Sequence, residues 1–284
     1  AAALVTCDTV ISKPSEHTPI IAFEVINIFL EQGVPEDAIH LLLGSGDLGK
    51  AIILNQNIDL VAFTGSLQTA KEIQKNLSLK PGKIIPLIAE TGGLNTMIID
   101  SSALLERACD DVMRSAFNSA GQRCSALRLL LVHKEVYSEF VSMLKGAIND
   151  LTIGFPDDLG TDIGPIITFD AMERLNNYLA KMKTEGCSLF QASRHAVPSH
   201  GSWILPTLIE LELSSMPNEE QFGPILHVAS YSEDTLIDSL KQIDLKGFAL
   251  TFGIQTRIDA KAMDVTKQTS SGNIYINRDI VGAV

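Results

Sequence analysis

The most restrictive feature of this sequence is a regular alternation of short apolar segments with longer segments whose apolar residues recur at helical spacing. Segments such as 60–63, 97–99 and 129–133 are almost continuously apolar, as strands buried on both faces of a sheet are. Segments such as 104–118 and 135–149 have the periodicity of amphipathic helices. Repeated strand–helix–strand units favour parallel strands joined by right-handed crossovers, so the sequence predicts an α/β fold.

The same pattern predicts the order of elements. The predicted strands are 10–13, 39–43, 60–63, 84–89, 97–99, 129–133, 225–230, 248–253 and 274–277. A helix with a broad buried face is expected from Thr18–Pro19 to Gly33, others end near 54 and 77 or cover 104–118, 135–149 and 170–186, and two more separate the last strands. The longest loop is 154–165, and long loops inside compact domains are often functional.

Composition excludes several classes of protein. With 45% hydrophobic residues the chain is too apolar to be disordered, yet it has no apolar run near the roughly 18 residues of a membrane span. A net charge of −12 argues against a general nucleic-acid binder, which needs a basic surface. The six histidines form no HxxxH pair, so a zinc site is not expected. Without a signal peptide or a CxxC motif, the chain is expected to be reduced and cytoplasmic.

The glycine-rich segment Gly44–Lys50 matches two phosphate-binding patterns, GxGxxG and GxxxxGK. A P-loop requires Ser or Thr after the lysine to bind magnesium, whereas Ala51 stands there. A Rossmann fingerprint requires an acid at the end of the next strand, which instead ends in Phe63-Thr64-Gly65. A tight strand-to-helix turn is therefore favoured, and phosphate binding is the alternative.

Three further segments combine polar side chains with glycine. In Phe63–Ser66 a glycine and a serine precede a helix, where free N–H groups attract phosphate, although the serine also fits an ordinary N-cap. Glu90–Gly93 follows a predicted buried strand, so its carboxylate is either a general base or a solvated acid. In Glu220–Pro224 the acid could hold ribose hydroxyls and the aromatic ring could stack on a flat ligand, unless the segment is only a turn.

Cys124 is the candidate nucleophile. It follows a predicted helix, lies in a loop of small residues and precedes a strand. The thiolate is the reactive form of cysteine, and positive charge or free backbone N–H groups favour it. The alternative is a small buried apolar residue, which is the interpretation that fits Cys7, Cys109 and Cys187.

Taken together and in this order, five segments resemble landmarks of the aldehyde dehydrogenase superfamily: Lys13–Glu16, Phe63–Ser66, Glu90–Gly93, Gly121–Cys124 and Glu220–Pro224. Cys124 follows Glu90 by 34 residues, which is also similar to the family's spacing. Within the superfamily, segments 100–104 and 119–128 look most like the L-glutamate γ-semialdehyde (Δ1-pyrroline-5-carboxylate) dehydrogenase domains of bifunctional proline-catabolic enzymes. The resemblance implies NAD-dependent oxidation of L-glutamate γ-semialdehyde to L-glutamate, the second step of proline catabolism.

The resemblance also implies a role for each matching residue. Cys124 would attack the aldehyde, its backbone N–H would stabilise the oxyanion, and Glu90 would activate the water that hydrolyses the thioester. Ser125 would contact the substrate carboxylate. The residues implied to bind NAD are Lys13, Ser15, Glu16, Gly46, Phe63, Thr64, Gly65, Ser66, Thr69, Thr91, Gly92, Glu220 and Phe222. The charge of Glu16 disfavours a 2′-phosphate, so NAD is expected rather than NADP.

The implied architecture is a partial NAD-binding domain of Rossmann type at residues 1–90 and a partial catalytic domain at 91–284. The family's oxyanion-hole asparagine and its Pro-Phe-Gly-Gly segment have no counterpart in the chain, which predicts a fragment that is catalytically poor or inactive by itself. The expected partner is a small aldehyde and not nucleic acid. The longer parent is expected to be a homo-oligomer with an upstream proline dehydrogenase domain that holds FAD outside this chain, and peripheral membrane association of that parent stays open.

Three alternatives remain. The first is another member of the superfamily, acting on a different semialdehyde or transferring the acyl group to CoA, although Glu90 favours hydrolysis over CoA transfer. The second is a P-loop nucleotide-binding protein built on residues 44–50, which magnesium-dependent ATP binding would support. The third is a non-catalytic scaffold, against which the presence of both Cys124 and Glu90 counts.

Overall fold

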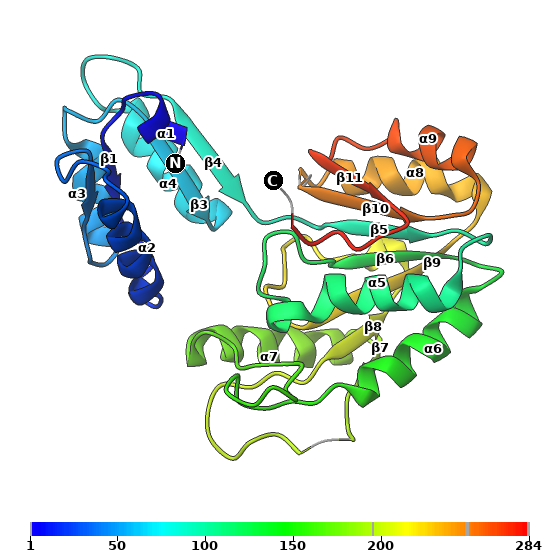
Figure 1. Ribbon diagram of the computed structural model, residues 1–284. Helices are drawn as coiled ribbons and strands as arrows, with labels where there is room; N and C mark the ends of the chain where they lie inside the picture. Colours follow the sequence, from blue (N-terminus) through cyan, green and yellow to red (C-terminus); the bar gives the residue numbers. More distant parts are fainter. Residues whose placement is uncertain (1, 195, 248–249, 283–284) are drawn as a thin grey trace. The chain divides into compact units, whose positions relative to one another are not determined.

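The computed structural model describes residues 2–194, 196–247 and 250–282. The chain divides into two compact units, Ala1–Thr91 and Gly92–Val284, which are blue to cyan and green to red in Figure 1. Strands and helices alternate in both units and the strands are mostly parallel, so the predicted α/β class is confirmed.

Unit 1 contains two small parallel sheets. Its strands are β1 (Val10–Ser12), β2 (Ile39–Leu41), β3 (Val61–Gly65) and β4 (Leu87–Thr91), and its helices are α1 (Ala2–Val5), α2 (Pro19–Glu31), α3 (Gly46–Leu54) and α4 (Leu67–Ser78). β1 pairs with β2 and β3 pairs with β4, both in parallel. Each pair is therefore a strand–helix–strand unit, as predicted, but among the described residues the four strands form two separate sheets.

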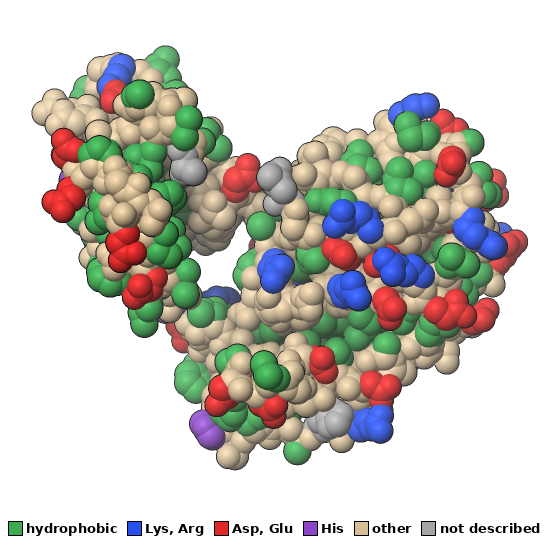
Figure 2. All heavy atoms as spheres, in the orientation of Figure 1, with side chains coloured by type: hydrophobic (Ala, Val, Ile, Leu, Met, Phe, Trp, Pro, Cys, Tyr) green, Lys and Arg blue, Asp and Glu red, His purple; other side chains and the backbone are tan. Residues whose placement is uncertain are grey.

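Helix α2 begins and ends as the sequence predicts, but its burial does not match. Pro19 occupies the first turn, and Gly33 follows the helix with a φ of +91°, a conformation that favours glycine. The expected broad buried face is wrong: only Ile26 is buried in the helix, while Ile20 and Ile21 are each 71% exposed. A helix that is apolar on all sides cannot be covered by the two-stranded sheet beside it, and Figure 2 shows hydrophobic side chains over the surface of unit 1.

Unit 2 is built on one seven-stranded sheet in the order β11-β10-β5-β6-β9-β8-β7. The strands are β5 (Thr96–Ile99), β6 (Leu129–His133), β7 (Ser188–Gln191), β8 (Thr207–Glu210), β9 (Ile225–Tyr231), β10 (Thr251–Gln255) and β11 (Asn273–Ile276). Its α-helices are α5 (Leu105–Phe117), α6 (Tyr137–Asp150), α7 (Phe169–Thr184), α8 (Glu233–Asp244) and α9 (Asp259–Thr266). Two short 3-10 helices lie at Asn118–Gly121 and Leu213–Ser215. All neighbouring strands are parallel except β7 and β8.

The core of unit 2 lies on both faces of its sheet. Alternate residues of β6 face opposite sides, so Leu130 and Val132 pack with α5, α6 and α7, while Leu129 and Leu131 pack with α8 and α9. All five residues of β6 are buried, which explains its uninterrupted apolar sequence. The predicted bounds of this strand are confirmed.

The clearest differences from the predicted strands concern two segments and one strand pair. Segment 84–89 was expected to be a strand, but β4 begins at Leu87, and Ile84 is 95% exposed. Of the predicted strand 248–253, Phe248 and Ala249 lie outside the described residues, and β10 begins at Thr251. The antiparallel pair β7–β8 was not predicted.

In the ranges 2–194, 196–247 and 250–282, the structure has no helix of the length and apolarity that a membrane crossing requires.

Candidate active site

The candidate nucleophile lies at the amino edge of the sheet of unit 2. Asn95 immediately precedes β5, the segment 119–128 leads into β6, and Glu220–Pro224 leads into β9. Because these strands are parallel and neighbouring, the three segments meet at the same edge. The structure therefore brings Cys124, Ser125, Glu220 and Phe222 to one side of unit 2.

The loop that carries Cys124 begins with three residues in the left-handed conformation. Ser119, Ala120 and Gly121 have φ values of +55°, +53° and +65°. A side chain at Gly121 would overlap the carbonyl oxygen of Gly223 and lie 2.9 Å from that of Ala116. The conformation favours glycine at position 121, although Ser119 and Ala120 also adopt it, and close packing requires glycine there.

The side chain of Asn95 holds the loop from the β5 side. Its Nδ2 donates to the carbonyls of Cys124 (2.7 Å) and Ala126 (2.8 Å), and its Oδ1 accepts the N–H of Thr251 at 3.0 Å. Cys124 itself is partly exposed, whereas Ser125 is only 5% exposed. In the described part of the chain, no hydrogen-bond partner is found for the backbone N–H of Cys124.

Gln122 connects the same loop to the long loop that ends at Pro165. Its Nε2 donates to the carbonyl of Pro165 at 3.1 Å, and its Oε1 accepts the N–H of Ile167 at 2.9 Å. The predicted loop over 154–165 is present, with one isolated bridge between Ile153 and Ile163. It therefore supports the backbone beside Cys124.

Arg128 joins the Cys124 loop to the segment that precedes β9. Its guanidinium is completely buried and donates to Glu220 Oε1 from Nε (3.1 Å) and Nη2 (3.0 Å). It also donates to the carbonyls of Arg123 and Gly223, each at 3.1 Å. One side chain thus contacts both segments through charge-assisted hydrogen bonds.

Glu220 is a partly dehydrated carboxylate. Its side chain is 14% exposed, and burial raises its pKa, while Arg128 and the backbone N–H of Gly93 oppose that increase. A side chain at Gly92 would overlap the Glu220 carboxylate, so Gly92 permits this close approach. Phe222 is 44% exposed, with its ring centre 5.3 Å from the Arg128 guanidinium.

The remaining candidate residues lie in unit 1. At the carboxyl end of the β3–β4 sheet, Thr64 is paired with Glu90 and Gly65 with Thr91. Glu90 was expected to follow a buried strand, but it lies within β4, and both Glu90 and most of that strand are exposed. Strand β4 is exposed because the described residues of unit 1 do not cover this part of the β3–β4 sheet.

Ser66 caps the helix that follows β3. Its Oγ accepts the N–H of Thr69 at 3.2 Å and lies 2.9 Å from the Thr69 hydroxyl. The N-cap interpretation of Ser66 is therefore confirmed. Helix α4 still presents free N–H groups at this end, which is the requirement for holding a phosphate.

Lys13 and Glu16 lie close together after β1. Lys13 Nζ is 3.8 Å from Glu16 Oε2 and donates to the carbonyl of Pro14, and Ser15 Oγ accepts the N–H of His17. The pKa of Glu16 is lowered, mainly by a hydrogen bond from its own backbone and less by Lys13.

The glycine-rich segment folds as a tight turn into α3. The absent side chain of Gly44 leaves room for Leu48, whose Cδ2 would be 2.6 Å from a β-carbon there. Gly46 has no such neighbour within 4 Å, so its surroundings are open. The favoured interpretation of a turn is supported by the first glycine, and the second leaves space for a ligand.

The other cysteines differ from one another. Cys109 is buried in α5, and burial raises its pKa to about 11, so it is confirmed as a core residue. Cys187 is only partly buried. The expectation for Cys7 is wrong: it is exposed, in the left-handed conformation, because the turn after α1 has no core to cover it.

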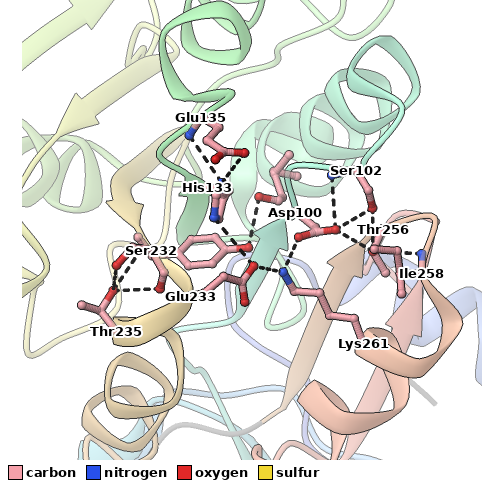
Figure 3. Close-up of polar contacts among 12 residues, drawn as sticks. Asp100, Ser102, His133, Glu135, Ser232, Glu233, Thr235, Thr256, Ile258 and Lys261 are labelled. Atoms are coloured by element: carbon pink, nitrogen blue, oxygen red, sulfur yellow. Dashed lines mark hydrogen bonds and ion pairs between the residues drawn. The ribbon is translucent and has the colours of Figure 1, made fainter.

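A second polar cluster lies at the carboxyl edge of the sheet of unit 2 (Figure 3). Asp100, which follows β5, accepts hydrogen bonds from Ser102 and Thr256 and pairs with Lys261 of α9. Lys261 also pairs with Glu233 of α8. Burial by itself would raise the pKa of Asp100, but these partners lower it to about 2. The groups satisfy one another, so this cluster joins α8 and α9 to the sheet.

Two residues near Cys124, at the amino edge of the sheet of unit 2, were not predicted as functional: Asn95 and Arg128. Both are buried polar residues next to apolar strands, where a polar residue is expected to have specific partners. A polar residue beside an apolar strand was therefore the sequence signal that could have identified Asn95 and Arg128.

No group of three or more His, Cys, Asp or Glu suited to a metal ion occurs among the residues that the structure describes.

The motifs, the α/β fold and the arrangement at the amino edge agree with a comparison against known families. Residues 1–284 match the aldehyde dehydrogenase family, and the chain belongs to that family.

The chain is similar to the bifunctional protein PutA of several bacteria. It is 44% identical over 293 residues to PutA of Klebsiella aerogenes and 43% identical to PutA of Escherichia coli, in each case over all of this chain and 22% of the relative. A crystal structure of PutA matches with a TM-score of 0.94 and 44% identity, over 100% of this chain and 28% of the other. The chain thus spans about a fifth of the length of these curated relatives.

It is also 30% identical to 1-pyrroline-5-carboxylate dehydrogenase 1 of Halalkalibacterium halodurans, over all of this chain and 55% of that protein. The prediction of the family, and of similarity to PutA within it, is confirmed.

Proposed function

We propose that the full-length protein that contains this chain oxidises L-glutamate γ-semialdehyde to L-glutamate, with NAD⁺ as the oxidant. The observation that carries the proposal is the arrangement of Cys124: a partly exposed thiol whose neighbouring carbonyls are held by Asn95 and Arg128, while its own N–H has no partner in the described residues. Similarity to PutA and to a 1-pyrroline-5-carboxylate dehydrogenase supports the choice of substrate.

The polar groups of the chain suit a dinucleotide. In unit 1, the N-terminus of α4 behind Ser66 can accept a phosphate, the open surroundings of Gly46 leave room for a base, and Lys13 with Glu16 can bind ribose hydroxyls. In unit 2, Glu220 is a carboxylate that is only 14% exposed and lies near the partly exposed Phe222. Ser15, Phe63, Thr64, Gly65, Thr69, Thr91 and Gly92 are the other residues proposed for this role. The chemistry that bound NAD⁺ supplies is acceptance of the hydride from the substrate carbon.

The chain's own residues supply the covalent steps. The Cys124 thiolate attacks the aldehyde carbon and forms a hemithioacetal, and the free N–H of Cys124 stabilises its oxyanion. After oxidation, Glu90 removes a proton from the water that hydrolyses the thioester, which releases glutamate and the thiol. Ser125 is proposed to contact the substrate carboxylate; in unit 2 taken alone it is nearly buried.

The test is NADH formation from L-glutamate γ-semialdehyde by the full-length protein and its variants. We expect Cys124→Ala to lower kcat by roughly a thousandfold or more, because no other group forms the covalent intermediate. The matched control is Cys109→Ala, which removes a buried thiol and leaves turnover nearly unchanged.

We expect Glu90→Gln to give a burst of one NADH per active site followed by slow turnover, because the thioester forms but is hydrolysed slowly.

Full steady-state activity in Cys124→Ala would contradict the covalent mechanism.

A second candidate is a related aldehyde substrate. The chain is 29% identical to a 3-sulfolactaldehyde dehydrogenase of Priestia aryabhattai over 97% of its length. A kcat/KM for 3-sulfolactaldehyde above that for L-glutamate γ-semialdehyde would replace the proposed substrate and keep the proposed mechanism.

A further inference from the structure

Arg128 is the largest completely buried charged side chain of unit 2 in the described residues, and no step of the proposed reaction uses it. A buried guanidinium is stable only if its donors find acceptors. The guanidinium of Arg128 donates four hydrogen bonds, two to Glu220 and one each to the carbonyls of Arg123 and Gly223. These acceptors belong to the two segments on which the proposed chemistry depends.

The contacts restrain the Cys124 loop from one side while Asn95 restrains it from the other. Arg128 holds the carbonyl that immediately precedes Cys124, and Asn95 holds the carbonyls of Cys124 and Ala126. A carbonyl that is fixed in direction also fixes the peptide N–H that follows it, because the peptide unit is planar. The Arg128–Arg123 contact, together with the N–H of Ala126 on the same carbonyl, therefore directs the N–H of Cys124.

The same side chain fixes the Glu220 carboxylate. Both of its donors go to Oε1, so Oε2 is the oxygen left on the side of Gly92. The carbonyl of Gly223 also packs against Gly121, so Arg128 and Gly121 hold the same peptide from two directions.

We propose that Arg128 is a positioning residue that sets the geometry of the Cys124 loop and of the Glu220 carboxylate together. The proposal rests on the proposed function in assigning roles to Cys124 and Glu220. Arg128 itself touches neither substrate nor cofactor; it couples the nucleophile to a cofactor-binding carboxylate through buried hydrogen bonds.

The alternative is that Arg128 only neutralises a buried acid. Under that alternative, removing both charges together would repair the damage caused by removing the arginine, as for many buried ion pairs. Under the proposal, the double removal restores stability but not the loop. The carbonyls of Arg123 and Gly223 keep the backbone N–H groups of Ala126 and Ile225 but lose the guanidinium that joins the two segments.

The experiment compares Arg128→Met, Glu220→Gln, the double variant and Arg128→Lys in the full-length protein. Four quantities are measured: the thermal midpoint of unfolding, the rate of iodoacetamide alkylation at Cys124 by peptide mapping, kcat, and KM for NAD⁺. The exposed Cys7 is the internal standard for alkylation. Lys145→Met with Glu210→Gln is the matched ion-pair control, because that pair joins α6 to β8 away from the loop.

The expected result for the double variant is a midpoint close to that of Glu220→Gln, with Cys124 alkylation and kcat still about tenfold or more below it. Arg128→Lys is expected to recover part of both rates, because an ammonium can serve some of the acceptors. If Arg128→Met does not fold, the double variant and Arg128→Lys still distinguish the positioning role from simple charge neutralisation. A Cys124 rate in the double variant equal to or above that of Glu220→Gln overturns the proposal.

Failure of the proposed function gives a different result. Alkylation requires neither NAD⁺ nor aldehyde, so a wild-type protein that forms no NADH would refute the function while the alkylation rates still test the positioning role.

Discussion

Gly121 is the position where adding a single β-carbon is expected to have a large effect on stability and on Cys124 reactivity. A β-carbon at this position would overlap the Gly223 carbonyl, and the φ of +65° is less favourable for alanine than for glycine. We expect Gly121→Ala to lower the free energy of unfolding by about 2–4 kcal/mol and to reduce Cys124 reactivity. Urea unfolding and alkylation at Cys124 measure these effects.

The matched control for that substitution is Gly146→Ala. Gly146 lies in the middle of α6, where an added β-carbon would have no neighbouring atom within 4 Å, and its φ is not positive. Alanine there should stabilise the chain by about 0.5–1 kcal/mol, because glycine is a poor helix former. A Gly121→Ala variant as stable as Gly146→Ala would show that the 119–121 turn is not restrained by its packing.

At the scale of elements, His227 connects three parts of unit 2. It lies on β9, its Nε2 is 2.7 Å from the hydroxyl of Tyr178 on α7, and its Nδ1 is 2.9 Å from the carbonyl of Arg128 before β6. The carbonyl can only accept, so Nδ1 donates and Nε2 accepts from the tyrosine, which requires a neutral ring. Burial lowers the pKa of His227 to about 4.

This shift predicts acid sensitivity. The unfolded chain binds a proton at His227 near pH 6.5, but the folded chain binds it only near pH 4. Stability is therefore complete above pH 6.5 and falls by about 3 kcal/mol between pH 6.5 and pH 4. Urea unfolding as a function of pH should show this slope, and His227→Gln should remove it. The exposed His40→Gln variant should retain it; loss of the slope there would assign it to another group.

The helices and strands differ in how well they could be predicted from the sequence. The strand 129–133 was predicted with its bounds because a strand buried on both faces has a continuous apolar sequence. The β7–β8 pair was missed because its strands are short and separated by the long segment 192–206. Burial around α2 was overestimated because apolar residues show what a helix can bury, not whether a partner covers it.

The candidate site was only partly predictable for a related reason. Cys124 and Glu220 were found by their motifs, but the contact between them through Arg128 depends on which strands are neighbours. The order β5-β6-β9 brings together segments that are far apart in the sequence, and strand order cannot be obtained from periodicity alone. The position of the site at the amino edge also departs from the usual location of ligands at carboxyl ends.

At the scale of the whole molecule, the two units have very different cores. The buried cluster of unit 1 consists of Ile53, Leu77 and Ile85, whereas unit 2 has two large clusters on the faces of its sheet. We expect amides of α3 and α4 to exchange with solvent about a hundredfold or more faster than those of β5 and β6, because less apolar area resists local opening. Hydrogen exchange followed by mass spectrometry of the 284-residue chain checks this. Equal protection in both units would mean that they unfold as one cooperative body.

The close approach of Gly92 and Glu220 has a consequence for the interpretation of natural variation. A carboxylate occupies the space where a side chain at position 92 would lie, so the two positions are not independent. Proteins of this family that carry alanine or serine at the equivalent of position 92 should also carry a shorter residue at the equivalent of 220. A variant at position 92 should therefore be judged together with the residue at position 220, because the added β-carbon meets the end of that side chain.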